Sequence, residues 1–143
     1  MLTQAVLLSG KDIPEIFSFI PELGNTLLKE TKNNVLSVYD PKTRIMRFIE
    51  CDPDETVMKL VIETLGGLAA STTSRLLKLI SKHISNLLFS TGFCEEEGTC
   101  YWEGFFLYSA LTDGSLEPLQ AALSKVKEIS KHEVNHITEK KDK

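Results

Sequence analysis

The chain has 143 residues, of which 42% are hydrophobic and 25% are charged, a composition typical of a folded domain rather than a disordered segment. Its formal net charge is −4 and its sequence pI is near 5.4, which disfavours nucleic-acid binding because that binding depends on Lys and Arg neutralising phosphates. The start of the chain has a short apolar run with no positive region before it, so neither a signal peptide nor a membrane span is predicted. We therefore expect a single cytoplasmic domain over residues 1–130.

The first elements are predicted from an apolar run and a capping pattern. Residues 3–8 are apolar and predict a short buried strand. A helix is expected next, because Asp12 can accept hydrogen bonds from the free backbone amides and Pro14 suits a first helical turn. Pro21 has no amide donor, so this helix should break or kink near Ile20.

Two runs rich in β-branched and aromatic residues, 35–39 and 45–49, predict the strands of a β-hairpin. The segment between them, Asp40 to Thr43, is typical of a type I turn, with Asp at its first position and Pro at its second. Two strands alone bury too little surface to be stable in water. Neighbouring segments should therefore cover this hairpin.

Capping signals and apolar periodicity predict three further helices. The first begins at Glu55, after an acidic cap and a first-turn proline, and ends near Gly66 and Gly67. The second spans residues 71–89, with apolar residues on one face and basic residues largely on the other. The third begins at Leu116.

Residues 100–111 fit either a strand or a buried helix, because their aromatic residues suit a sheet and also recur at helical spacing. Residues 131–143 are polar and are expected to form a frayed tail.

The three cysteines, Cys51, Cys94 and Cys100, are odd in number and lack the CxxC spacing of zinc knuckles. A bridge between Cys94 and Cys100 is the alternative to two reduced thiols. The reduced thiols are favoured, because disulfides are rare in cytosolic proteins.

The tail contains HEVNH, a formal match to HExxH that runs from His132 to His136. In zinc proteases this spacing places two His side chains one turn apart on a helix, where both can bind the metal. Here no apolar segment surrounds the motif to exclude water. A solvated tail is favoured, and we predict no catalytic residues, no metal and no other cofactor.

The densest aromatic cluster comprises Trp102, Phe105, Phe106 and Tyr108. Packing in the core is the favoured interpretation of this cluster. A ligand pocket or a protein interface is the alternative, because aromatic residues are also enriched at such places.

GKDIP from Gly10 to Pro14, which follows the first strand, and NVLSV from Asn34 to Val38 resemble ACT-type regulatory domains. The resemblance covers about residues 3–65 and implies a ferredoxin-like βαββα core. It also implies binding of small effectors such as amino acids, commonly across a dimer interface.

A second segment resembles another family. NLLFSTG from Asn86 to Gly92 and WEGFFLYSAL from Trp102 to Leu111 are similar to divergent viral Bcl-2-like proteins. This resemblance implies an all-α bundle that binds BH3 helices in a hydrophobic groove and thereby regulates apoptosis.

Together these observations favour an α+β fold with a small antiparallel sheet built on the hairpin and helices packed on one face. We expect a non-enzymatic regulatory or sensor module, a homodimer that binds a small-molecule effector or a protein partner. The candidate ligand-binding residues are Gly10, Asp12, Pro14, Trp102, Phe105 and Tyr108. The alternative is the all-helical Bcl-2-like apoptosis regulator.

Overall fold

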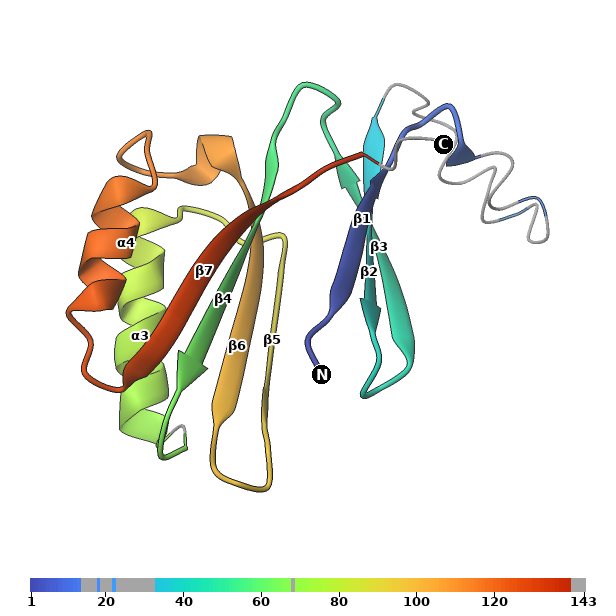
Figure 1. Cartoon of the computed structure of the whole chain (residues 1–143). Helices are drawn as coiled ribbons and strands as arrows, with labels where there is room; N and C mark the ends of the chain where they lie inside the picture. The colour runs from blue at the N-terminus through green and yellow to red at the C-terminus, as the bar shows by residue number, and fades with distance from the viewer. Residues whose placement is uncertain (14–17, 19–21, 23–32, 68, 140–143) are drawn as a thin grey trace. The chain divides into compact units, whose positions relative to one another are not determined.

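The computed structural model describes residues 1–13, 18, 22, 33–67 and 69–139 (Figure 1). Where the sequence predicts one domain, contacts within the chain group it into two compact units. The first unit holds residues 1–55 and 137–143, and the second unit is the continuous segment 56–136.

The first unit contains a three-stranded antiparallel sheet in the order β1-β2-β3. Its strands are β1 (Gln4–Leu8), β2 (Asn34–Asp40) and β3 (Ile45–Cys51). The predicted first strand and the predicted hairpin are therefore confirmed. Most of the helix predicted between them lies outside the described residues.

The turn between β2 and β3 is held by the side chain of Asp40. One carboxylate oxygen accepts a hydrogen bond from the amide of Lys42 at 2.9 Å, and the other accepts one from the hydroxyl of Thr43 at 2.8 Å. The Thr43 hydroxyl is the main reason that the pKa of Asp40 lies below its usual value. The predicted role of Asp40 in the turn is confirmed.

The far end of the chain returns to the first unit. Leu7 and Glu139 form a parallel β-bridge, and the amide of Leu7 donates to the carbonyl of Thr138 at 3.4 Å. The side-chain amide of Asn34 also donates to the Glu139 carboxylate at 3.2 Å. Thr138 and Glu139 therefore extend the β1 edge of this sheet.

The second unit has a four-stranded sheet in the order β5-β6-β4-β7, and helices α3 and α4 lie on one side of it (Figure 1). Its elements, in chain order, are β4 (Val57–Thr64), α3 (Ala70–His83), β5 (Phe89–Cys94), β6 (Cys100–Leu107), the 3-10 turn η1 (Tyr108–Ala110), α4 (Glu117–Ser124) and β7 (Ile129–Ile137). Strand β6 is antiparallel to both β4 and β5.

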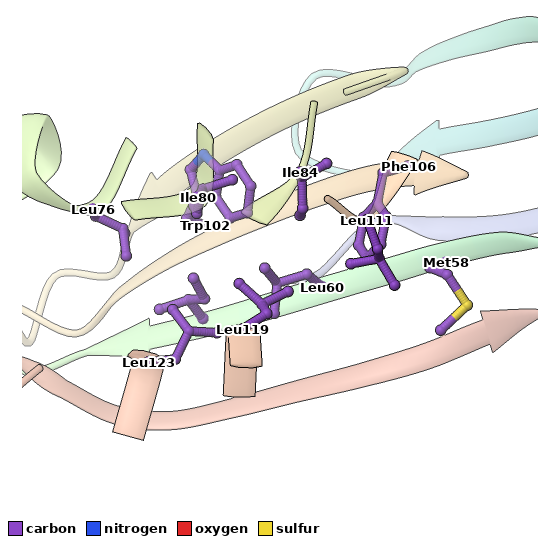
Figure 2. Packing of buried hydrophobic residues seen from close by; sticks show 11 residues of the cluster. Met58, Leu60, Leu76, Ile80, Ile84, Trp102, Phe106, Leu111, Leu119 and Leu123 are labelled. Atoms are coloured by element: carbon purple, nitrogen blue, oxygen red, sulfur yellow. The ribbon is translucent and has the colours of Figure 1, made fainter. Parts of the chain in front are cut away.

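One hydrophobic core joins the helices to the sheet in the second unit (Figure 2). Met58, Leu60 and Ile62 alternate along β4 and all face this core, because alternate residues of a strand point to the same side. The core consists of Met58, Leu60, Ile62, Leu76, Ile80, Ile84, Trp102, Phe106, Leu111, Leu119 and Leu123. Burial of apolar side chains from both helices on one sheet face therefore stabilises the unit.

Gly104 is required by the close approach of the Trp102 ring. A Cβ atom at position 104 would lie 2.3 Å from Cη2 and 2.7 Å from Cζ3 of the indole. Both residues belong to β6 and point to the helix side of the sheet, as the alternation of a strand requires. The absence of a side chain at Gly104 thus creates the space that the indole occupies.

Strand β4 corrects the helix predicted from Glu55. The acidic cap residue Asp52 forms a turn instead, in which its carbonyl accepts from the amide of Glu55 at 3.1 Å. Residues of β4 are buried on both faces of the sheet, so the apolar residues follow one another closely enough to imitate helical spacing. The helical prediction is wrong for this reason.

Gly66 and Gly67 occupy the turn that joins β4 to α3, where both have positive φ angles, of 80° and 82°. Glycine adopts such angles without steric cost. Helix α3 follows, and the hydroxyl of Thr73 donates to the carbonyl of Ala69 at 3.2 Å at its start. The break predicted at these glycines is present, although the element before it is a strand.

Three other boundaries differ from the sequence prediction. Helix α3 ends at His83, because Ile84 is extended, and Phe89, the last residue of the predicted helix, begins β5. Residues 100–107 form strand β6, so the all-α alternative is wrong. Residues 131–137 belong to β7 rather than to a frayed tail, and half-buried Val134 packs against the core.

The α+β class is therefore confirmed, with mainly antiparallel sheets and helices on one sheet face. Among the described residues, no helix combines the length and the apolar composition needed to cross a membrane.

We expect the Gly104→Ala variant to lose about 1–3 kcal/mol of unfolding free energy, because the new methyl group would overlap the Trp102 ring. Chemical denaturation of the purified variant measures this loss. The change should be largely suppressed in the background Trp102→Leu, since the smaller side chain leaves room for the methyl group. Losses that simply add in the double variant would contradict this explanation.

Candidate functional site

The structure describes two of the three residues that the sequence predicts for a loop site. Gly10 is buried and Asp12 is half-buried in the turn after β1, where the amide of Asp12 donates to the carbonyl of Ser9 at 3.0 Å. Pro14 lies outside the described residues. The effector-binding role predicted for this loop stays a prediction.

The predicted aromatic cluster is not a single cluster. Trp102 lies in the core under the helices, whereas Phe105, three positions along β6, points to the opposite face of the sheet. Tyr108 lies in the turn after β6, with 37% of its surface exposed. These three side chains therefore do not line one pocket.

Phe105 belongs to a buried group that the sequence does not indicate. The ammonium of Lys59 lies 5.5 Å from the centre of the Phe105 ring and 2.7 Å from the carboxylate of Glu103. The side chain of Lys59 is 11% exposed and that of Glu103 is fully buried. Removing either partner of a buried ion pair would leave an uncompensated buried charge, so we assign this pair a structural role.

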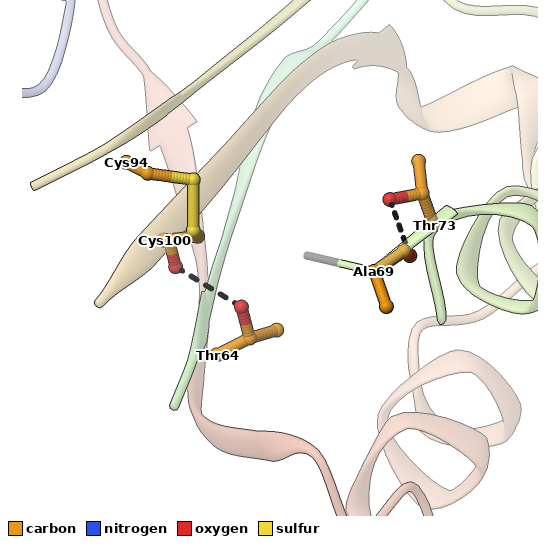
Figure 3. Close-up of a disulfide and its surroundings, with 5 residues drawn as sticks. All are labelled: Thr64, Ala69, Thr73, Cys94 and Cys100. Atoms are coloured by element: carbon orange, nitrogen blue, oxygen red, sulfur yellow. Dashed lines mark hydrogen bonds between the residues drawn. A yellow bond between two sulfur atoms is a disulfide. The ribbon is translucent and has the colours of Figure 1, made fainter. Parts of the chain in front are cut away.

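The Cys94–Cys100 disulfide corrects the prediction of two reduced thiols (Figure 3). The register of β5 and β6 places Cys94 directly opposite Cys100, with their Cα atoms 4.0 Å apart. The hydroxyl of Thr64 donates to the carbonyl of Cys100 at 3.4 Å and ties this hairpin to β4. Sequence spacing alone does not reveal that the turn folds these two residues onto each other.

We expect reduction of the Cys94–Cys100 bond to lower the unfolding free energy by about 2 kcal/mol, the entropic value for closing so short a loop. Denaturant midpoints with and without dithiothreitol, alongside a thiol count, measure the effect. Burial raises the pKa of the Cys51 thiol, so Cys51 should react slowly in the native protein. The Cys94→Ala/Cys100→Ala variant should not respond to the reductant, and an unchanged midpoint in the fully reduced wild type would contradict the prediction.

His132 and His136 lie on strand β7 rather than on a helix. A strand rises about 3.3 Å per residue, so residues four apart on it are separated by roughly 13 Å. That separation is too large for two His side chains to bind one zinc ion in the HExxH manner. In the part of the chain that the structure describes, no group of three or more metal-ligating side chains is found.

A cavity of about 470 Å³ lies in the second unit, where helix α3 meets the turn between α4 and β7. Its size falls within the usual range for small-molecule sites. Its walls are formed by Arg75, Leu76, Leu79, Lys125, Val126, Lys127 and Glu128. We call this the basic cavity.

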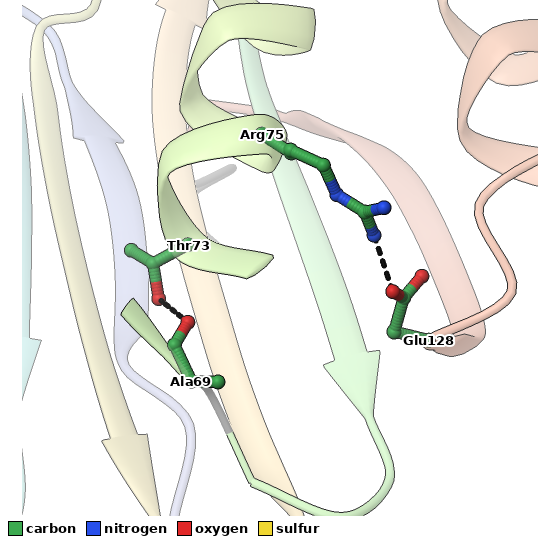
Figure 4. A network of polar contacts seen from close by, with 4 residues as sticks. All are labelled: Ala69, Thr73, Arg75 and Glu128. Atoms are coloured by element: carbon green, nitrogen blue, oxygen red, sulfur yellow. Dashed lines mark hydrogen bonds and ion pairs between the residues drawn. The ribbon is translucent and has the colours of Figure 1, made fainter. Parts of the chain in front are cut away.

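The charged residues of the basic cavity come from two elements. Arg75 extends from α3 and forms an ion pair with Glu128, which precedes β7 (Figure 4). A hydrogen bond from its own backbone amide is the main reason that the pKa of Glu128 is lowered; burial opposes this effect, and the Arg75 guanidinium adds to it. Glu128 is therefore ionised at neutral pH.

Lys125 and Lys127 complete the positive charge around the basic cavity. Both are exposed, and neither forms an ion pair within the described part of the chain. The apolar wall is provided by Leu79 and Val126, which are half-buried, and by buried Leu76. The cavity can therefore hold a small molecule that carries both negative charge and apolar surface.

Sequence reasoning misses the basic cavity because its residues are distant in the chain. The only local signal is KVKE, in which Lys125 and Lys127 flank Val126 within the helix predicted to begin at Leu116. Arg75 occupies the predicted polar face of α3, where a solvated side chain is the default expectation.

Comparison with known proteins yields a partial similarity. No protein-family model matches the chain. The bifunctional glutamine synthetase adenylyltransferase/adenylyl-removing enzyme of Bradyrhizobium diazoefficiens is 33% identical to it over 81 residues. The match covers 56% of this chain and 8% of the enzyme, so the chain spans only a small part of that relative's length. The similarity therefore does not carry the enzyme's activity to this protein.

Proposed function

We propose that this protein is a non-enzymatic regulatory module that binds a small effector in the basic cavity. The main observation behind this proposal is that three basic side chains and an apolar wall line one cavity, although the chain as a whole has a negative net charge. A ligand that ties α3 to the turn before β7 would favour one state of the module by its differential affinity.

The topology of the second unit supports a second proposal, which concerns its fold. Its chain order, β-α-β-β-α-β, and its strand order, β5-β6-β4-β7, agree with the split β-α-β arrangement of ferredoxin-like domains. The ACT-type resemblance assigns that arrangement to residues 3–65, whose described part holds the three-stranded sheet β1-β2-β3 and also β4, a strand of the other sheet. We therefore propose the ferredoxin-like arrangement for residues 57–137 instead, as an analogy of fold rather than of function.

We also propose that the module forms homodimers through the β5 edge of the second unit. Strand β5, FSTGFC, carries no charge and no proline, the residues with which proteins usually protect a free strand edge. The opposite edge strand, β7, carries an ion pair between Lys131 and Glu133, whose atoms lie 2.6 Å apart. An unprotected edge favours pairing with a second copy of the same strand.

The cavity assignment is tested by filling the cavity. A thermal-shift screen of the wild type should include amino acids and nucleotides, the latter because the similar enzyme is named for adenylyl chemistry. We expect one compound class to raise the unfolding temperature, since a ligand that binds only the native state stabilises it. The Val126→Trp variant should lose this shift, because the indole would occupy the cavity.

The matched control for that substitution is Leu77→Trp. Leu77 is 43% exposed on α3 and does not line the basic cavity, so the control adds the same bulk elsewhere. It should keep the ligand-induced shift. A screen without any hit, or an equal shift in Val126→Trp, would refute the proposed function.

The dimer proposal predicts that Ser90→Lys is monomeric in sedimentation equilibrium under conditions in which the wild type is a dimer. Ser90 is an exposed residue of β5, and two lysines brought together at a paired edge would repel each other. Asn135→Lys adds the same charge to exposed β7 and should remain dimeric. A wild type that sediments as a monomer would count against the β5 interface.

A further inference from the structure

The basic cavity carries two positive charges that the described part of the chain does not balance. Its cations are Arg75, Lys125 and Lys127, and its one anion is Glu128. Glu128 pairs with Arg75, whereas neither lysine has an ion-pair partner among the described residues. A ligand with two negative charges would restore local neutrality.

The internal ion pair sets a condition on the ligand. The side chains of Arg75 and Glu128 are 62% and 36% exposed, and exposed pairs contribute little to stability. A carboxylate ligand would merely replace Glu128 with an equivalent group at Arg75. A phosphate monoester offers more charge and three acceptor oxygens, so it can displace Glu128 and also contact both lysines.

The apolar wall sets a second condition. Leu79 and Val126 border the same cavity as the charged groups, and Leu76 behind them is 3% exposed. Inorganic phosphate would leave this wall in contact with water. A planar organic group attached to the phosphate would cover it and gain from the loss of exposed apolar surface.

We propose that the effector of the basic cavity is a small organic phosphate monoester, such as a nucleoside monophosphate. Its phosphate contacts Arg75, Lys125 and Lys127, and its organic group packs on Leu79 and Val126. Glu128 acts as an internal competitor that the phosphate displaces. This assignment rests on the proposed function and specifies the ligand for the same cavity.

Isothermal titration of the full chain with four probes tests the ligand class. The probes are AMP, adenosine 5′-carboxylic acid, adenosine and inorganic phosphate, so that charge and organic surface vary separately. We expect AMP to bind at least about tenfold more tightly than each of the others, because none of them supplies both the dianion and the apolar surface.

Substitutions in the basic cavity test the roles of individual residues. Lys127→Gln should weaken AMP binding about tenfold, as the loss of one charge-assisted contact requires. Glu128→Gln should tighten AMP binding, because Arg75 is then free of its internal partner. Replacing a residue with a merely structural role would weaken AMP binding, so tighter AMP binding in Glu128→Gln identifies Glu128 as the competitor.

Lys78→Gln is the matched control, since Lys78 is an exposed residue of α3 that does not line the basic cavity. It should leave AMP affinity unchanged. Equal affinity for AMP and adenosine 5′-carboxylic acid, or weaker AMP binding in Glu128→Gln, would overturn the phosphate assignment. A non-phosphate effector that binds the wild type but not Val126→Trp would also overturn it while preserving the proposed function. If no compound binds at all, both proposals fail.

Discussion

The second unit depends on the packing of two helices against a single face of its sheet. On that face the Trp102 indole lies over Gly104 in β6, the strand hydrogen-bonded to both β4 and β5. Residues Met58, Leu60 and Ile62 of β4 extend the same apolar surface beneath α3 and α4. Because the apolar faces of both helices are packed on the sheet, the solvent-facing sides of the helices and the turn between α4 and β7 have fixed positions around the basic cavity.

The basic cavity combines an apolar wall that is anchored in the core with charged side chains that can change partners. Leu76 anchors α3 in the core, while Arg75, the preceding residue, reaches outward to Glu128 (Figure 4). An exposed ion pair contributes little to the stability of the fold, so a ligand that replaces one partner does not destabilise the protein. A site of this construction is suited to reversible binding, because the charged contacts can change while the apolar core stays intact.

The elements that the sequence predicts correctly are those with local causes. Asp40 and Pro41 specify the β2–β3 turn through hydrogen bonds and a fixed φ angle, and α3 has a clear apolar stripe. Strand β4 escapes prediction because it is buried on both faces, so its apolar pattern lacks the alternation of a strand. Strand β7 escapes it because an exposed edge strand tolerates the polar residues that otherwise indicate a tail.

The candidate site required the tertiary structure. Strands β5 and β6 and helix α4 lie between Arg75 and Lys127 in the chain, and only the fold brings these two residues to the same cavity. The Cys94–Cys100 bond depends likewise on strand register, which is not visible in cysteine spacing. The fold separates the aromatic residues instead, since Trp102 and Phe105 are only three positions apart in sequence but lie on different faces of one strand.

The bridge between Leu7 and Glu139 has a consequence for the order in which the protein is built. The second unit is made from one uninterrupted segment, whereas the first unit draws on residues from both sides of that segment. During synthesis on the ribosome, β1 must therefore wait for its outer neighbour until the whole second unit has been translated. Of the two units, the one that begins earlier in the chain is therefore completed later.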